Sequence, residues 1–155
     1  MASKKLVKCR YTHCKHKDDL RPPDEMVQGG RGTYYHPDCA EERDTINRIV
    51  DYYCNNVDDR VTISQLRSVI NNIIFKKGVP AKELLFDLKY THESGRKINS
   101  PLTLHYIITN KKVQHEYKKH LESAVTNFDN KEVKVKEETK VTYKPSNSKG
   151  FTDIF

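Results

Sequence analysis

Tyr34-Tyr35-His36-Pro37-Asp38-Cys39 is the stretch that decides the fold, because it places a histidine and a cysteine three residues apart at the start of a predicted helix. Pro37 suits the first position of a helix, and residues three apart share one helical face. The glycine-rich stretch from 26 to 35 predicts a short hairpin just before this helix. Two more cysteines lie upstream, so hairpin and helix are expected to bring together Cys9, Cys14, His36 and Cys39.

These four side chains predict a metal site. Thiolates and a neutral imidazole are the ligands that Zn²⁺ takes in closed, tetrahedral structural sites. The ligand set has open alternatives, since His13 and His16 flank Cys14 and can replace either early ligand. A plainer interpretation keeps the hairpin and helix and treats the cysteines as ordinary reduced thiols. Cys54 lies far along the predicted helix and is expected to be a buried thiol instead of a fifth ligand.

The order of a cysteine knuckle, a hairpin and a helix with the last two ligands resembles a treble-clef zinc finger. The His36-Pro37-Asp38-Cys39 element is similar to the one in LIM and related fingers. The resemblance covers roughly residues 8–55, and the spacing from Cys9 to Cys14 is wider than the usual Cys-x₂-Cys. It implies a zinc finger over residues 1–57, in which Zn²⁺ is a structural brace. No secretory signal is expected at the N-terminus, and the spacing favours metal binding over disulfides.

The net charge of +7 is concentrated in the middle of the chain. Residues 1–59 hold 10 basic and 11 acidic side chains, a net charge of −1, whereas residues 60–123 hold 12 basic and 5 acidic ones, a net charge of +7. Residues 124–155 add 6 basic and 5 acidic side chains. Such an excess favours polyanionic partners. No stretch approaches the ~20 apolar residues of a membrane span, so no membrane partner is expected.

Several amphipathic helices are expected after the hairpin, which predicts a mainly α fold. Apolar residues follow a helical period over 37–55, and a second helix is expected from Thr62, where Gln65 completes a capping-box spacing. Gly78 ends that helix, a third runs from Pro80 to Ser94-Gly95, and Ser100-Pro101 opens a fourth. A further stretch through residues 113–121 continues it or follows a break near Asn110. Residues 58–125 are therefore expected to form a basic helical module with a possible helix-turn-helix.

The basic residues of this module are candidate phosphate contacts, while the plainer interpretation is a solvated basic surface. Phosphate contacts are salt-dependent and carry no sequence information by themselves. Base contacts are expected from Arg67, Asn71 and Asn72 if the second helix enters a groove. The candidate nucleic-acid-binding residues are Arg67, Lys76, Lys77, Lys82, Lys89, Arg96 and Lys97.

Residues 77–90 resemble a sequence found after Cys/His fingers in uncharacterised proteins of Gram-positive bacteriophages. The shared features are a Lys-Gly pair, Lys77-Gly78, before a short helix that ends in Leu88-Lys89-Tyr90. The resemblance implies a phage context and cytoplasmic location in a bacterial host cell. It brings no established activity.

The C-terminal part, residues 126–155, is expected to be a flexible tail. The helical period is lost over 127–149, where Lys and Glu alternate with valines, so disorder or an edge strand is expected there. The chain ends in an apolar peptide that resembles two replication peptides, the pentapeptide that binds the bacterial sliding clamp and the C-terminal tip of bacterial single-stranded-DNA-binding proteins. Its candidate partner-binding residues are Phe151, Asp153, Ile154 and Phe155.

The sequence shows no constellation typical of an enzyme. It has no phosphate-binding glycine motif, no Gly-x-Ser-x-Gly and no His-Glu-x-x-His. A His-Asn-His nuclease would need a metal-binding histidine in the finger helix, and residues 40–55 contain none. We therefore expect a zinc-stabilised, non-catalytic protein that binds DNA or RNA in replication or transcription. The alternative is an adaptor or inhibitor that binds a host replication, transcription or defence protein through the finger and the C-terminal peptide.

Overall fold

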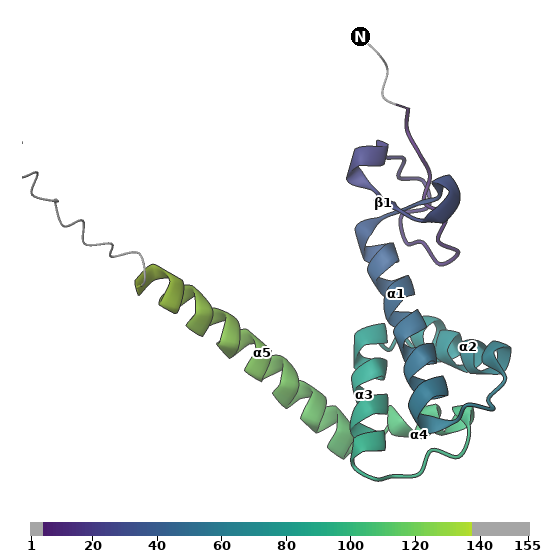
Figure 1. Cartoon of the computed structure of the whole chain (residues 1–155), viewed down its shortest axis with the longest axis vertical. Helices are drawn as coiled ribbons and strands as arrows, with labels where there is room; N and C mark the ends of the chain where they lie inside the picture. The colour runs from purple at the N-terminus through teal and green to yellow at the C-terminus, as the bar shows by residue number, and fades with distance from the viewer. Residues whose placement is uncertain (1–4, 138–155) are drawn as a thin grey trace, which may run out of the picture. The chain divides into compact units, whose positions relative to one another are not determined.

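The computed structural model describes residues 5–137, with side chains for residues 5–126. Helices dominate this part of the chain, and a two-stranded antiparallel hairpin lies near the N-terminus (Figure 1), which confirms the predicted fold class. Internal contacts divide the chain into one unit of residues 1–117 and another of residues 118–155. This division falls after Tyr117, whereas the sequence placed boundaries after residues 57 and 125.

The hairpin pairs β1 (Val27–Gln28) with β2 (Tyr34–Tyr35), and Val27 lies opposite Tyr35. A 3₁₀ turn (η1, Pro23–Glu25) precedes it, and a second one (η2, Gly30–Gly32) closes the loop. A side chain at Gly29 would force its neighbours to shift, because a Cβ there would lie 2.6 Å from both Thr33 Oγ1 and Tyr35 Cε2. The close approach of the two strands therefore favours glycine at this position.

α1 (Pro37–Tyr52) joins the hairpin to the helical body (Figure 1) and continues as a π-helical turn, η3 (Tyr53–Val57). Its first turn buries Cys39 against the hairpin, where Arg43 lies 4.3 Å from the centre of the Tyr35 ring. Its second half buries apolar residues, among them Ile49 and Tyr53, in the main core. One helix thus belongs both to the predicted finger and to the main core.

The remaining helices follow the expected stop signals. α2 (Ile63–Asn71) continues as a π-helical turn, η4 (Asn72–Lys76), before α3 (Ala81–Glu93). A 3₁₀ turn (η5, Pro101–Thr103) leads into α4 (Leu104–Ile107), and α5 (Lys111–Glu137) begins just after Asn110. Gly78 and Gly95 have φ of 73° and 76°, a left-handed conformation that favours glycine. The chain therefore ends η4 and α3 where the sequence predicted.

The main core lies where α1 contacts α2 and α3, and α4 contacts α3. Burial of such apolar faces contributes about 25 cal/mol per Å² and is the main stabilising term. The most fully buried apolar members include Ile49, Tyr53, Leu66, Ile70, Ile73, Leu84, Leu88, Leu104 and Val113. A smaller second cluster contains the three cysteines of the predicted metal site and Met26.

Two local expectations differ from the structure. Thr62 precedes α2, but its side chain makes no capping hydrogen bond, so the capping box with Gln65 is not formed. The helical period was expected to end before residue 127, yet α5 continues to Glu137, because Lys and Glu favour a helix more than the interspersed valines oppose it. No helix in the described residues is long and apolar enough to cross a membrane. The C-terminal peptide with Phe151, Asp153, Ile154 and Phe155 lies outside the described residues.

Candidate metal centre

Cys9, Cys14, His36 and Cys39 converge on one point, as the sequence predicted. Their ligand atoms all lie within 4.8 Å of one another, and all four residues are buried. The hairpin brings them together, because the backbone N–H of Arg10 donates to the carbonyl of Tyr34 at 2.9 Å. This bond places the segment with Cys9 beside β2, and the chain enters α1 two residues later. The cluster can hold a metal ion.

The four ligand atoms lie close enough together to share one metal ion. Zn–S bonds of about 2.3 Å and Zn–N bonds of about 2.0–2.1 Å place neighbouring ligand atoms roughly 3.5–3.8 Å apart in a tetrahedron. Cys14 Sγ and His36 Nδ1 are 3.4 Å apart. With three thiols and one imidazole, the donor set is soft, which favours Zn²⁺ over hard cations such as Mg²⁺ and Ca²⁺.

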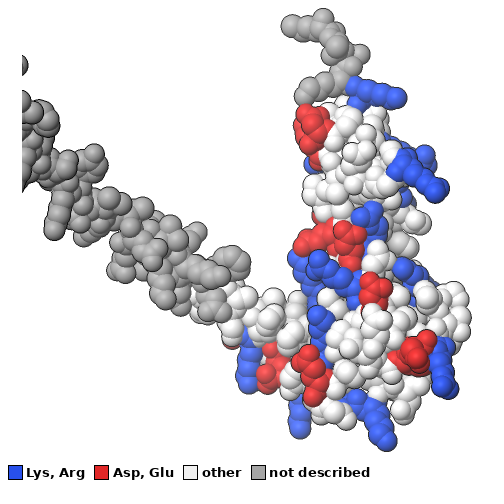
Figure 2. Space-filling model, viewed as in Figure 1, with Lys and Arg blue, Asp and Glu red and all other residues white. Residues whose placement is uncertain are grey.

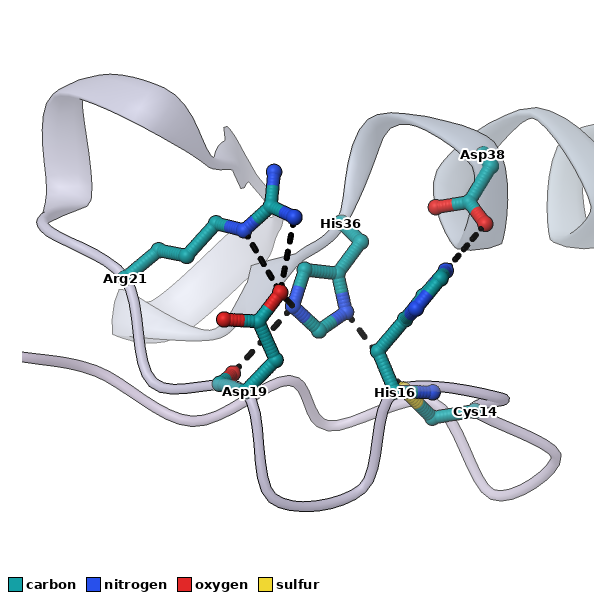
Figure 3. Close-up of polar contacts among 6 residues, drawn as sticks. All are labelled: Cys14, His16, Asp19, Arg21, His36 and Asp38. Carbon is teal, nitrogen blue, oxygen red and sulfur yellow. Dashed lines mark hydrogen bonds and ion pairs between the residues drawn. The ribbon is translucent and has the colours of Figure 1, made fainter.

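His36 is oriented by its other ring nitrogen (Figure 3). Nδ1 faces Cys14, whereas Nε2 lies 3.3 Å from the backbone carbonyl oxygen of Asp19 and 3.8 Å from its carboxylate. A ligating histidine commonly donates its second N–H to a carbonyl or carboxylate, which fixes the ring orientation. Arg21 donates to the same carboxylate at 2.7 Å and 2.8 Å. Its hydrogen bond holds the pKa of Asp19 below the usual value for an aspartate.

A second set of contacts joins the knuckle to the first turn of α1 (Figure 3). The backbone N–H of His16 donates to Cys14 Sγ at 3.3 Å, and the His16 ring lies 2.8 Å from Asp38 Oδ2. The hydrogen bond with His16 lowers the pKa of Asp38. His16 therefore contacts the ligand Cys14 and the first turn of α1, which carries Cys39, and is not itself a ligand.

The open alternatives for the ligand set are resolved by packing. His13 is not in the cluster, because its ring stacks on Phe75 of η4 with the ring centres 3.7 Å apart. Cys54 is also outside the cluster and packs against the main core, half-buried. The supporting contacts of Asp19, Arg21 and His16 were missed by the sequence reasoning. The contacts of Asp19 with His36 and of His16 with Asp38 join residues 17 and 22 positions apart, which leaves no periodic signal in a sequence.

The thiols are strongly perturbed by their surroundings. Burial raises the pKa of Cys39 to about 12, and the nearby Cys14 and Cys9 sulfurs raise it as well. Burial also acts to raise the pKa of Cys9, but hydrogen bonds from the backbone N–H groups of Tyr11 and His36 outweigh it, so that pKa is lowered. Three thiolates packed this closely repel one another, and a bound cation offsets that repulsion.

The candidate nucleic-acid-binding residues do not form one cluster. Lys82 pairs with Glu41 of α1 at 2.6 Å, Arg67 donates to Asn47 at 3.0 Å, and Lys89 lies 5.5 Å from the ring centre of Tyr52. Lys and Arg side chains are interspersed with Asp and Glu on the face in Figure 2. The other four candidates are exposed near the two ends of α3 and have no carboxylate partner among the described residues: Lys76, Lys77, Arg96 and Lys97.

Comparisons with known proteins add no relative. No protein-family model, curated protein or solved structure matches this chain. The resemblances to treble-clef fingers and to phage sequences therefore stay predictions from the sequence.

Proposed function

We propose that the cluster of Cys9, Cys14, His36 and Cys39 binds Zn²⁺ and forms the centre of a treble-clef finger. The convergence of four buried ligand atoms within 4.8 Å supports this assignment, together with the contact of His36 Nε2 to Asp19. Four protein ligands leave no open position for water on a tetrahedral ion, which supports a structural role and a non-catalytic protein. Substitution with Co²⁺ should give the visible absorption of a tetrahedral thiolate site, and an octahedral spectrum would contradict the assignment.

The function that we favour for the whole chain is nucleic-acid binding by a zinc-stabilised helical module. One observation carries it, the net charge of +7 on residues 60–123. We narrow the proposed contact set, since Lys82, Arg67 and Lys89 each contact a residue of α1. The contacts are therefore assigned to the exposed cations Lys76, Lys77, Arg96 and Lys97, which a phosphate backbone can reach without breaking an ion pair.

This function is tested by fluorescence anisotropy with labelled duplex DNA, duplex RNA and single strands. Affinity should fall steeply between about 50 and 200 mM salt, because each neutralised phosphate releases counterions. The variant Lys76→Ala/Lys77→Ala/Lys97→Ala should weaken duplex binding and lower the salt dependence. Absence of binding to all of these probes at 50 mM salt would contradict the function.

A second candidate function is that of an adaptor for a host protein such as the sliding clamp. Leu102 and Tyr106 favour it, because they lie four residues apart on η5 and α4 and are 55% and 76% exposed. Exposed apolar pairs of this kind suit a partner's groove. Titration calorimetry with a bacterial sliding clamp tests the idea on three chains: the unaltered chain, Leu102→Ala/Tyr106→Ala, and a chain lacking residues 150–155. Equal heats from all three chains would exclude both the apolar pair and the C-terminal peptide as the contact.

A further inference from the structure

A basic groove lies on the outer side of the metal-ligand segment. It has a volume of about 660 Å³, within the range of ligand-binding sites in proteins. No carboxylate lines it, and its charged lining residues are Lys5, Lys8 and Arg10. The rest of the wall is formed by Val7, Cys9, Tyr11, Gly32 and Tyr34. The groove therefore combines three positive charges with two aromatic rings.

The three cations of the groove are available to a ligand. All three side chains are exposed, and none forms an ion pair with a carboxylate among the described residues. Two other cations of this N-terminal part are paired, since Arg21 pairs with Asp19 and Arg43 with Asp44. A concave site lined with charge of one sign attracts anions more strongly than a flat, mixed surface does.

The groove and the candidate metal site share one segment, because Cys9 belongs to both. Exposed Lys8 and Arg10 alternate with Cys9, whose side chain is buried in the ligand cluster, as expected for an extended segment. The backbone of this segment is held to β2 by the hydrogen bond from Arg10 to Tyr34. Bound metal would therefore fix the spacing of the two cations and the position of this segment relative to Tyr34.

The aromatic rings decide which anion fits. Tyr11 and Tyr34 both line the groove and are half-buried, so neither residue is fully covered by the protein. Grooves that bind single-stranded nucleic acid combine cations along the backbone with rings on which bases stack. A duplex keeps its bases stacked inside and cannot use such rings. A simple phosphate would use the cations alone.

We propose that this groove binds a single-stranded segment of DNA or RNA, with phosphates on Lys5, Lys8 and Arg10 and a base stacked on Tyr34. The proposal rests on the nucleic-acid-binding function proposed above and adds a second contact surface to it. The exposed cations near the ends of α3 serve duplex binding, whereas the groove serves an unpaired strand. The predicted finger would then act as a recognition element as well as a brace.

The test compares two triple variants of the full, zinc-loaded chain that lose the same charge. Lys5→Ala/Lys8→Ala/Arg10→Ala alters the groove, and Lys76→Ala/Lys77→Ala/Lys97→Ala alters the helical body. Anisotropy is measured with labelled oligo-dT, oligo-U and a duplex between 50 and 200 mM salt. The groove variant should bind single strands roughly tenfold more weakly, and the slope of log K against log salt should fall by about 2, since each phosphate contact contributes about 0.7.

A second pair of variants tests the stacking contact. Tyr34→Leu should weaken single-strand binding roughly five- to a hundredfold, whereas Tyr34→Phe keeps the ring and should bind like the unaltered chain. Zinc content and circular dichroism report whether each variant folds. Equal binding by the leucine and phenylalanine variants would show that no base stacks on this residue.

The outcomes separate this proposal from the function on which it rests. If the groove variant binds single strands as the unaltered chain does and the body variant binds them less, the groove proposal is wrong. The proposed nucleic-acid-binding function is then still supported. An equal loss in both variants also overturns the groove, because it indicates diffuse attraction to charge. If the unaltered chain binds none of the probes, this result contradicts both the proposed nucleic-acid-binding function and the groove proposal.

Discussion

Replacing Asp87 with asparagine should stabilise the protein at neutral and alkaline pH. Asp87 lies on the buried face of α3 with no exposed surface, and neither carboxylate oxygen has a hydrogen-bond partner among the described residues. Burial raises its pKa from 3.8 to about 7, and the negative charge of Glu83 one turn away raises it as well. An unpaired buried charge is costly, so the folded chain retains the proton where the unfolded chain releases it.

The sign and size of the effect follow from these two pKa values. Well below pH 3.8 the carboxyl is neutral in both states, and its ionisation costs the fold nothing. Between pH 3.8 and about 7 only the unfolded chain loses the proton, so the free energy of unfolding falls as pH rises. At about 1.36 kcal/mol for each pKa unit, the full loss is at most roughly 4 kcal/mol, and roughly half of it falls above pH 5.5.

The measurement is urea unfolding followed by circular dichroism from pH 5.5 to 8.5 with zinc present. Asparagine has the size of aspartate and cannot ionise, so the advantage of Asp87→Asn over the unaltered chain should grow by about 2 kcal/mol from pH 5.5 to 8. Both chains carry the same metal site, so its own pH dependence cancels. Asp51→Asn, at an exposed position of α1, is the control and should show no such trend. An advantage of Asp87→Asn that is constant with pH would refute the reasoning.

Other substitutions test the hairpin and the core. Gly29→Ala should weaken zinc affinity in a chelator competition, because its Cβ would lie 2.6 Å from a ring atom of Tyr35, while Gly30→Ala, with no atom within 4 Å, should not. Ile49→Ala should lower the free energy of unfolding by about 2–5 kcal/mol in urea titrations, since this fully buried residue lies in the main core. Tyr53→Phe should change it by less than about 1 kcal/mol, because the buried hydroxyl has no partner among the described residues. A loss above 2 kcal/mol would reveal a partner for that hydroxyl.

The ligand set and the ends of the early helices were predictable because they are local features of the sequence. His36 and Cys39 are fixed by helical spacing, and Gly78 and Gly95 occupy left-handed positions that glycine favours. The choice of Cys9 and Cys14 over the flanking histidines was not settled by spacing. It depends on the stacking of His13 on Phe75, about sixty residues away, which no local pattern encodes.

The parts that could not be predicted depend on contacts between distant residues or on competing preferences. The backbone carbonyl oxygen of Asp19 lies 3.3 Å from His36 Nε2. Every residue type has such a carbonyl, so the sequence gives no sign of this contact. The charge count indicated a basic module but could not show that Lys82 pairs with Glu41. In α5 the alternation of valines with Lys and Glu indicated disorder or an edge strand, and helix propensity prevailed up to Glu137.

The central claim is that three cysteines and one histidine hold a structural Zn²⁺, and native mass spectrometry of the full chain tests it most directly. We predict one Zn²⁺ per chain, retained by Cys54→Ser and lost by Cys39→Ser, with loss of cooperative unfolding after chelation. A chain purified with zinc in the buffer that carries no metal, or a Cys39→Ser variant that keeps its full zinc content and cooperative unfolding, would contradict the claim.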